Sequence, residues 1–396
     1  FGSRLRAAAP RPRGRAAAPM DDAGWRRAVL QEPQLMNKAP KAIRADHEFF
    51  LEAIAKDYSC LEFAHENLLS DREFLVRAVG VVSMVMRYVP AALRGDREFM
   101  LDCARKNNMA LEYASAELRG DPSFMRKALK MNQFALRFAT DDLRGNREFM
   151  QELIKRNGPA LQYADEELRA DHTMVLFAVQ QNVIAFQFAA KSVLEDEAFV
   201  LDVLAHNHHA LAYASATLRS DGAFMLKAMG IDVIALKHCA GELLGDRAFV
   251  LAAVAQDWRA LGYAAGLQDD QEIVLVAVRH NFQAIGFASE GRRQDPEVLL
   301  EAVKQSNTVL SNAPASVRED RDFMLQAVRN NWQALKYATE EQREDRELVA
   351  EAAKQNYAAV EYASEAIRGD REFLIHLRSF AKARCEEMPS GDAGST

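Results

Sequence analysis

The chain has 396 residues, of which 49% are hydrophobic and 27% are charged, and its formal net charge at pH 7 is −7. This composition is typical of a soluble protein with a sizeable core. The acidic balance disfavours a broad nucleic-acid-binding surface, which usually carries a basic excess. No apolar run reaches the roughly 18–20 residues that a membrane span needs.

Residues 1–20 contain five Arg, no acidic residue and much Ala and Pro. Such a segment cannot bury a core, so we predict that it is disordered. It resembles a transit peptide in being Arg-rich and free of acidic residues, although it has one Ser and no clear amphipathic face. The sequence does not assign a compartment: the cytoplasm is the default, and an organelle is the alternative if residues 1–20 are a transit peptide.

One phrase recurs along the rest of the chain and is clearest at residues 96–120, DREFMLDCARKNNMALEYASAELRG. Each copy starts at an anchor residue, counted here as position 0. The anchors are Asp21, Asp46, Asp71, Asp96, Asp121, Asn146, Asp171, Asp196, Asp221, Asp246, Asp270, Asp295, Asp320, Asp345 and Asp370. Thirteen of the fourteen steps are 25 residues long, and the step from Asp246 to Asp270 is 24. A fixed period of this length is the signature of a stacked-repeat protein.

Each copy predicts two helices. The anchor Asp suits an N-cap, because its carboxylate can accept a hydrogen bond from a free backbone N–H. Apolar residues at positions 3, 4, 7 and 8 indicate a helix of about ten residues with one buried face. Asn stands at position 11 in eight copies, and Asn tolerates the left-handed conformation that commonly ends a helix. A second, shorter helix follows over the Ala-Leu-x-Tyr-Ala stripe, and Leu-Arg-Gly closes the turn.

Two columns of the repeat indicate close packing between copies. Position 18 is Ala in twelve of fourteen copies, and position 17 is Phe or Tyr in eleven. A large ring beside a small residue lets neighbouring helices approach without leaving voids. The cysteines Cys60, Cys103 and Cys239 stand in columns held mainly by Ala, so we interpret them as small buried thiols.

The predicted fold is therefore an all-α solenoid of about fourteen 25-residue helix-turn-helix repeats. It would form one continuous domain over residues 21–385. Residues 21–45 are the predicted N-terminal cap repeat and residues 370–385 the C-terminal capping helix. We predict a disordered tail at residues 386–396.

The phrase D-x-E-F-hydrophobic-L-x-A-V-x-x-N-x-x-A-L-x-Y-A-S-x-x-L-R resembles the repeat of a family catalogued as domain of unknown function 4116 (DUF4116). Residues 96–120, 321–344 and 346–369 carry the resemblance most plainly, and it extends over nearly all of residues 21–380. The resemblance implies a helical repeat and no established activity.

An Arg ladder is the first candidate site, because Arg recurs at position 23 and equal positions stack in a solenoid. Its members are Arg94, Arg119, Arg144, Arg169, Arg219, Arg318, Arg343 and Arg368. The structural interpretation, which we prefer, pairs each Arg with an adjacent anchor Asp or first-turn Glu. The alternative is a cationic stripe that grips phosphates or acidic partners.

An aromatic ladder is the second candidate site, at position 12, where earlier copies have Ser83, Asn108 and Gln133. Its members are Trp258, Phe282, Trp332 and Tyr357. Since the fold tolerates small polar residues at this position, the rings are candidates for an exposed partner-binding ladder, and Trp and Tyr are enriched at binding hot spots. The alternative is local packing across the turn.

Catalytic constellations are weak in this sequence. His206, His208 and His209 match no zinc-binding spacing, and the pair His238-Cys239 occupies two packing columns. There is no Gly-rich phosphate loop, HExxH or GxSxG motif. We predict that the protein is not an enzyme and uses neither a metal nor a cofactor.

The leading functional prediction is a scaffold for protein-protein interaction, since stacked repeats offer extended binding surfaces. Its partner would be another protein. The alternatives are single-stranded RNA binding by tandem helical repeats, which the acidic charge disfavours, and a structural subunit of a larger complex.

Overall fold

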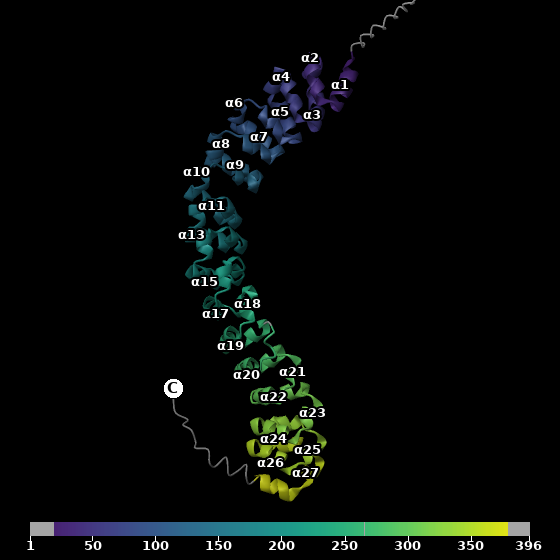
Figure 1. The fold of residues 1–396 in the computed structure, drawn as a ribbon, viewed down its shortest axis with the longest axis vertical. Helices are drawn as coiled ribbons and strands as arrows, with labels where there is room; N and C mark the ends of the chain where they lie inside the picture. Colours follow the sequence, from purple (N-terminus) through teal and green to yellow (C-terminus); the bar gives the residue numbers. More distant parts are fainter. Residues whose placement is uncertain (1–19, 265, 379–396) are drawn as a thin grey trace, which may run out of the picture. The chain divides into compact units, whose positions relative to one another are not determined.

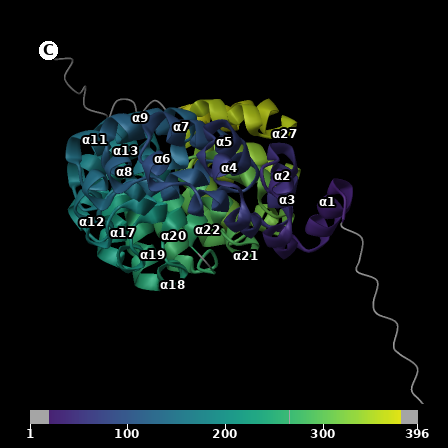
Figure 2. The same cartoon turned by 90° about the horizontal axis from the view of Figure 1, so that it is seen from above.

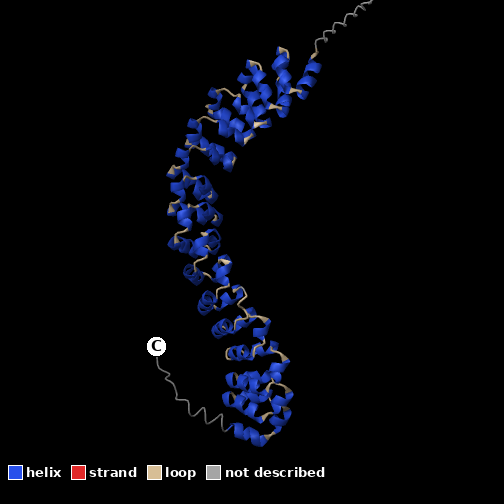
Figure 3. Cartoon of the chain, viewed as in Figure 1, coloured by secondary structure: helices blue, strands red, loops and turns tan. Residues whose placement is uncertain are grey.

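The computed structural model describes residues 20–264 and 266–378 of the chain. Every regular element in these two ranges is a helix, and Figure 3 shows helices joined by short loops with no strand. The all-α tandem-repeat fold is therefore confirmed. The leader at residues 1–19, the tail at residues 386–396 and the end of the predicted capping helix lie outside the described residues.

The chain divides into two compact units, Phe1–Phe188 and Ala189–Thr396, which are described separately (Figure 1). The single continuous domain over residues 21–385 stays a prediction. Among the helices of residues 20–264 and 266–378, none is long and apolar enough to cross a bilayer.

Each repeat of the first unit contains a long α-helix, then a 3-10 helix (η), then a short α-helix. The long helices are α1 (Asp22–Gln31), α3 (His47–Lys56), α5 (Arg72–Val81), α7 (Arg97–Lys106), α9 (Pro122–Met131), α11 (Arg147–Arg156) and α13 (His172–Gln181). The 3-10 helices are η1 (Pro33–Lys38), η2 (Tyr58–Phe63), η3 (Ser83–Arg87), η4 (Asn108–Tyr113), η5 (Gln133–Phe138), η6 (Gly158–Tyr163) and η7 (Val183–Phe188). The short helices are α2 (Lys41–Arg44), α4 (Glu66–Ser70), α6 (Ala91–Arg94), α8 (Ala116–Gly120), α10 (Asp141–Arg144) and α12 (Glu166–Arg169).

The second unit repeats the same order of elements, with one short helix missing. Its long helices are α15 (Glu197–His206), α17 (Gly222–Ile231), α19 (Arg247–Gln256), α20 (Gln271–His280), α22 (Pro296–Val303), α24 (Arg321–Asn330) and α26 (Arg346–Gln355). Its 3-10 helices are η8 (His208–Tyr213), η9 (Val233–His238), η10 (Trp258–Tyr263), η11 (Phe282–Phe287), η12 (Asn307–Asn312), η13 (Trp332–Tyr337) and η14 (Tyr357–Tyr362). Its short helices are α14 (Lys191–Leu194), α16 (Ala216–Arg219), α18 (Gly241–Leu244), α21 (Glu290–Arg293), α23 (Ala315–Glu319), α25 (Glu340–Glu344) and α27 (Glu365–Gly369).

The two-helix description of the repeat was incomplete, because the segment predicted as a closing turn is a helix of its own. Its N-cap is position 19, where Ser115 Oγ accepts a hydrogen bond from the Leu118 N–H at 3.4 Å. Proline at this position, as in Pro90 before α6, fits because an N-cap needs no backbone N–H for the helix. The second predicted helix, over the Ala-Leu-x-Tyr-Ala stripe, is a 3-10 helix rather than an α-helix.

The anchor residue starts each long helix as predicted. Asp96 Oδ1 accepts a hydrogen bond from the Phe99 N–H at 2.7 Å, and Asn146 Oδ1 accepts one from the Phe149 N–H at 2.9 Å. Each long helix except α22 is ten residues long. One side-chain oxygen therefore fixes where the helix of each repeat begins.

The role predicted for the Asn at position 11 was wrong. Asn107 has φ −154° and ψ 112°, which is extended backbone and not left-handed. Its side chain accepts a hydrogen bond from the Met109 N–H at 3.1 Å, so it caps the start of η4 instead of ending α7. Val82, which replaces Asn in its copy, gives η3 no side-chain cap. A short polar side chain can cap a helix by accepting a hydrogen bond from a nearby backbone N–H. This capping role, and not the left-handed conformation, accounts for the Asn at position 11.

In each unit, the hydrophobic core runs along the inside of the row of repeats. Phe99 and Met100 of α7 are fully buried, as are Ala110 and Leu111 of η4 within 1%. Within each unit, long helices of successive repeats lie side by side, as α5 and α7 do in both views (Figures 1 and 2). Because each repeat is small, it completes its core only against its neighbours.

Main-chain hydrogen bonds also join successive repeats. The N–H of position 19 donates to the carbonyl oxygen of position 23 in the preceding copy, for example Ser115 to Arg94 at 2.9 Å and Ser364 to Arg343 at 3.0 Å. Pro90 and Pro314 occupy position 19 in other copies and have no N–H to donate. Thr339 is also at position 19, but its N–H donates to Gln342 Oε1 at 3.0 Å, so the backbone bond joins many but not all successive copies.

The copy that starts at Asp246 is one residue shorter than the others, and the difference lies between η10 and α20. After η10 the chain passes through a turn at residues 266–269 and enters α20, so the short helix of this copy is absent from the described residues. Gly266 has φ 77°, a left-handed value that side chains other than glycine rarely adopt. This turn replaces the helix with a shorter connection.

Candidate binding surface

The four predicted ladder aromatics open the 3-10 helices of the second unit. Trp258, Phe282, Trp332 and Tyr357 are the first residues of η10, η11, η13 and η14, and all four rings are half-buried. They follow an extended residue at position 11, which turns the chain away from the long helix. None of the four is fully enclosed in the core.

The two tryptophans of the ladder pack against an aromatic ring of the next repeat rather than against the next ladder member. Trp332 stacks on Tyr362 with ring centroids 6.1 Å apart and an interplanar angle of 25°. Trp258 meets Phe287 at 5.9 Å in the same relation, position 12 of one copy against position 17 of the next. The ladder therefore consists of two interleaved columns.

The second column is the Phe or Tyr of position 17, which we had interpreted as packing between copies. Phe287 is 44% exposed, and Tyr337 and Tyr362 are half-buried. The neighbouring Ala at position 18 is buried, as Ala338 is at 6%, whereas Phe138 is a buried member of the position-17 column at 7%. The sequence shows the aromatic residues of this column, but it does not predict that their rings are partly exposed.

The other two ladder residues differ in their surroundings. Phe282 lines a hollow of about 590 Å³, together with Ile285, Leu299 and Val309. Tyr357 is covered by Arg378, whose guanidinium lies 5.2 Å from the ring centroid and whose Nε donates to the Tyr357 hydroxyl at 3.0 Å.

A glutamine from the next repeat holds the backbone beneath two of the rings. Gln355 Oε1 accepts a hydrogen bond from the Trp332 N–H at 3.1 Å, and its Nε2 donates to the Val328 carbonyl at 2.6 Å. Gln305 makes the same pair of contacts with Phe282 and Val278, at 2.9 and 2.7 Å. These positioning residues were missed from the sequence, where they are ordinary polar residues at a helix end.

The Arg ladder at position 23 lies on or beside the short helices and is half-buried, except for the exposed Arg368. Its predicted pairing with anchor Asp or first-turn Glu was wrong. Arg119 Nε donates to the Ala114 carbonyl at 3.2 Å, and Arg219 and Arg318 make the matching bond at 3.3 and 3.2 Å.

Some ladder arginines also bond acidic residues of their own short helix. Arg343 Nη2 lies 3.0 Å from Glu340, and Arg144 and Arg169 form equivalent pairs with Asp141 and Glu166. In Arg94, Arg169 and Arg343 the Nε is buried and makes no hydrogen bond within the described parts of the chain. These half-buried contacts within the fold favour the structural interpretation of the column.

A different arginine column pairs with the anchors, and it was missed. The residue at position 1 of one copy bonds the anchor carboxylate of the next, as in Arg72 to Asp96 at 3.0 Å and Arg346 to Asp370 at 2.6 Å. The backbone N–H of Phe99 lowers the pKa of Asp96, and the Arg72 guanidinium lowers it further. The signal was the Asp-Arg-Glu-Phe motif itself, whose Arg we had left without a role.

The histidine and cysteine candidates do not assemble into a site. His208 and His209 have ring centroids 4.1 Å apart, but no cluster of three metal-ligating side chains occurs within residues 20–264 and 266–378. Burial raises the pKa of Cys239 to about 11, so its thiolate is disfavoured. His238 beside it is half-buried, and burial lowers its pKa.

These features define an all-α tandem-repeat protein whose surface carries aromatic and charged columns in register. The comparison with known families gives the family: domain of unknown function (DUF4116) matches residues 46–94, 96–144, 146–194, 246–291 and 295–343. The chain belongs to this family, and each match spans two of the 25-residue copies. No curated protein and no solved structure matches the chain.

Proposed function

We propose that the chain is a non-catalytic scaffold that binds another protein through the two aromatic columns of its second unit. The observation that carries this proposal is the stacked pair Trp332 and Tyr362, which is fixed by its neighbours and still half-exposed. A ring that is already held in place loses little conformational freedom on binding. Trp and Tyr are also the residues most enriched at binding hot spots.

The hollow beside Phe282 supports the same surface. Apolar side chains form part of its lining, beside polar ones that include Glu290 and Arg293, and the neighbouring Phe287 is 44% exposed. An anchor side chain of a partner would bury its apolar area there, since hot-spot residues insert into such pockets. The surface thus offers both projecting rings and a place to receive one.

RNA binding has less support, because the regular arginine columns are engaged within the fold. The position-1 arginines, such as Arg147 and Arg321, bond anchor carboxylates, and the net charge of the chain is −7. A phosphate backbone needs cations whose charge is not already balanced. A structural subunit of a larger complex would use the same aromatic surface. It would differ from an interaction scaffold only in that its complex is permanent.

Affinity purification with quantitative mass spectrometry tests the proposal, using the full chain as bait. We compare the wild type with the double variant Trp258→Ala, Trp332→Ala. The matched control is the double variant Ser83→Ala, Asn108→Ala, which changes the same position of the repeat in the first unit.

A protein partner that is lost from the aromatic variant and retained by the control supports the proposal. Equal partner recovery from all three baits would exclude the aromatic columns as the binding surface. Recovery of RNA that falls steeply with added salt would instead favour the RNA-binding alternative.

A further inference from the structure

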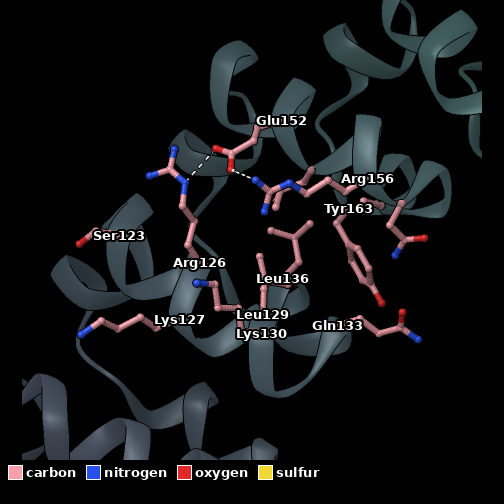
Figure 4. A pocket seen from close by; sticks show the side chains of 13 residues that line it. Ser123, Arg126, Lys127, Leu129, Lys130, Gln133, Leu136, Glu152, Arg156 and Tyr163 are labelled. Carbon is pink, nitrogen blue, oxygen red and sulfur yellow. Dashed lines mark hydrogen bonds and ion pairs between the residues drawn. The ribbon is translucent and has the colours of Figure 1, made fainter. Parts of the chain in front are cut away.

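A second hollow lies in the first unit, between α9 and α11, with a volume of about 470 Å³ (Figure 4). Leu129, Leu136 and Leu153 form its apolar lining, and Tyr163 stands at one side. Few contacts join α9 to α11, whereas α11 packs closely on α13. Among successive long helices within the first unit, α9 and α11 are therefore the pair that lies farther apart.

An oversized side chain explains why the hollow forms here. Position 7 of the long helix holds Leu153 in this copy, while neighbouring copies have small residues such as Cys103, Ala128 and Ala178. Those small residues are buried within 1%, but Leu153 is half-buried and lines the hollow. Since a leucine cannot fit where an alanine fills the space, it keeps α11 away from α9.

On its other side, the repeat that contains α11 lies close to the repeat that follows it. Gly158 at the start of η6 is buried, and a Cβ built on it would lie 2.3 Å from the Ala178 carbonyl oxygen of α13. Only glycine permits this approach of η6 to α13. Leu129 is left half-buried by the shift, although its counterparts Ile54 and Val79 are fully buried.

The rim of the hollow is cationic. Arg126, Lys127, Lys130 and Arg156 border it, against the single carboxylate of Glu152, as Figure 4 shows. Glu152 is shared, since Arg126 Nε lies 2.9 Å and Arg156 Nη2 3.3 Å from its oxygens. Lys127 faces Glu98 only at 3.8 Å, and Lys130 makes no ion pair within residues 20–264 and 266–378. With Glu98 counted beside Glu152, four cations face two carboxylates, which leaves an excess of two positive charges.

We propose that this hollow is a binding site for a small organic anion with an apolar body, such as a medium-chain carboxylate. The carboxylate would lie among Lys130, Arg126 and Arg156, and the apolar body would lie on the three leucines. The volume falls within the range of about 300–1,000 Å³ that is usual for small-molecule sites. This site lies in the first unit and is independent of the aromatic surface proposed above.

A compact ligand fits this site better than an extended protein segment. An amphipathic helix or peptide needs an apolar groove that continues over several turns. Here the neighbouring long helices pack on each other, α7 on α9 and α11 on α13, so the groove ends at one junction. The ligand must therefore fit between two helices.

Isothermal titration calorimetry with decanoate, below the concentration at which it forms micelles, tests the proposal on the full chain. Decanol provides the apolar body without the charge, and butyrate provides the charge without the body. We expect one decanoate per chain, weaker binding of both controls, and affinity that falls with added salt.

Two variants locate the site without removing core residues. Lys130→Gln should weaken decanoate binding about two- to fivefold, the factor of a partly exposed ion pair. Gln133→Trp should abolish it, because position 12 holds Trp in two other copies and that ring would cover Tyr163 as Trp332 covers Tyr362.

The matched controls are Lys155→Gln, on α11 with its ammonium over the Phe177 ring, and Asn108→Trp, in the preceding repeat. Both should bind decanoate like the wild type. Equal binding of decanol and decanoate, or undiminished binding by Gln133→Trp with its circular dichroism unchanged, would overturn the proposal. So would several decanoates bound per chain without a distinct first site.

Discussion

Arg147 Nη1 donates a hydrogen bond to Oδ2 of Asp171, 2.7 Å away in the next repeat. The other oxygen of the same carboxylate accepts the Met174 N–H at 2.9 Å. One side chain thus both starts its own helix and ties it to the preceding copy. The guanidinium of Arg147 and the Met174 N–H lower the pKa of Asp171 although partial burial opposes them.

This linkage predicts how stability depends on pH. The anchor carboxylates Asp71, Asp96, Asp121, Asp171 and Asp270 all have a pKa below the ordinary value of 3.8. A lowered folded-state pKa stabilises the protein above the unfolded pKa, and that stability is lost as pH falls through the folded value. We expect a constant melting temperature from neutral pH to about pH 5 and a steep fall below about pH 4. Circular dichroism melts across this range measure it; a melting temperature unchanged in acid contradicts the linkage.

The capping role of the position-11 residue gives a second prediction. Asn107→Ala removes the acceptor for the Met109 N–H and should cost about 0.5–2 kcal/mol. Asn107→Asp should be nearly neutral, because Asp57 and Asp257 cap their 3-10 helices in the same way. Hydrogen exchange of the η4 amides measures both changes.

The converse substitution serves as the control for the capping role. Val82→Asn should stabilise η3 by a similar amount, because this helix has no side-chain cap. If Asn107→Asp proves as damaging as Asn107→Ala, the cap is not the reason for the Asn.

Close approach at Gly158 gives a third prediction. Gly158→Ala would place a methyl group against the Ala178 carbonyl and should cost about 1–3 kcal/mol through displaced backbone. Gly286→Ala is the matched substitution within another 3-10 helix, where a Cβ has nothing within 4 Å. It should be neutral or stabilise by about 0.4–1 kcal/mol through reduced freedom of the unfolded chain. Thermal unfolding of the two variants should therefore shift in opposite directions, and equal shifts would contradict the packing at α13.

The Arg column at position 23 gives a fourth prediction. Arg119→Ala loses hydrogen bonds to the carbonyls of Ala114 and Phe138 and should cost about 1.5–3 kcal/mol, as bonds from charged donors do. Arg105→Ala removes an Arg that is 60% exposed and pairs with Asp102 on its own helix, so it should change stability by less than about 1 kcal/mol. Urea unfolding compares them. If Arg119→Ala leaves stability unchanged, the column is free for binding and its structural interpretation fails.

The sequence predicted the elements of a repeat better than the contacts between repeats. The anchor Asp, the ten-residue helix and the buried columns follow from local rules of capping and helical spacing. The third helix was missed because Leu-Arg-Gly has the composition of a turn and the helix is only one turn long. The 3-10 geometry of Ala-Leu-x-Tyr-Ala likewise has no distinct apolar spacing at that length.

Contacts between repeats depend on an offset that periodicity does not contain. A fixed period predicts that equal positions recur along a stack, and both ladders were built on that basis. In the structure Trp332 meets position 17 of the next copy, and Arg72 meets the next anchor. The hollow beside Leu153 had a signal, a leucine among small residues, but its volume follows from how two helices respond to that side chain.

The junction between copies is made by main-chain atoms, the N–H of Ser115 and the carbonyl of Arg94 among them. Such a bond uses no side-chain atom, although proline removes the N–H in some copies and the Gln342 side chain takes the N–H of Thr339 in another. Individual copies can therefore diverge, and whole 25-residue units can be gained or lost by unequal recombination, while a new boundary can form the same main-chain bond wherever the N–H of position 19 is free. Evolution can thus change the length of the protein and the identity of its surface residues independently.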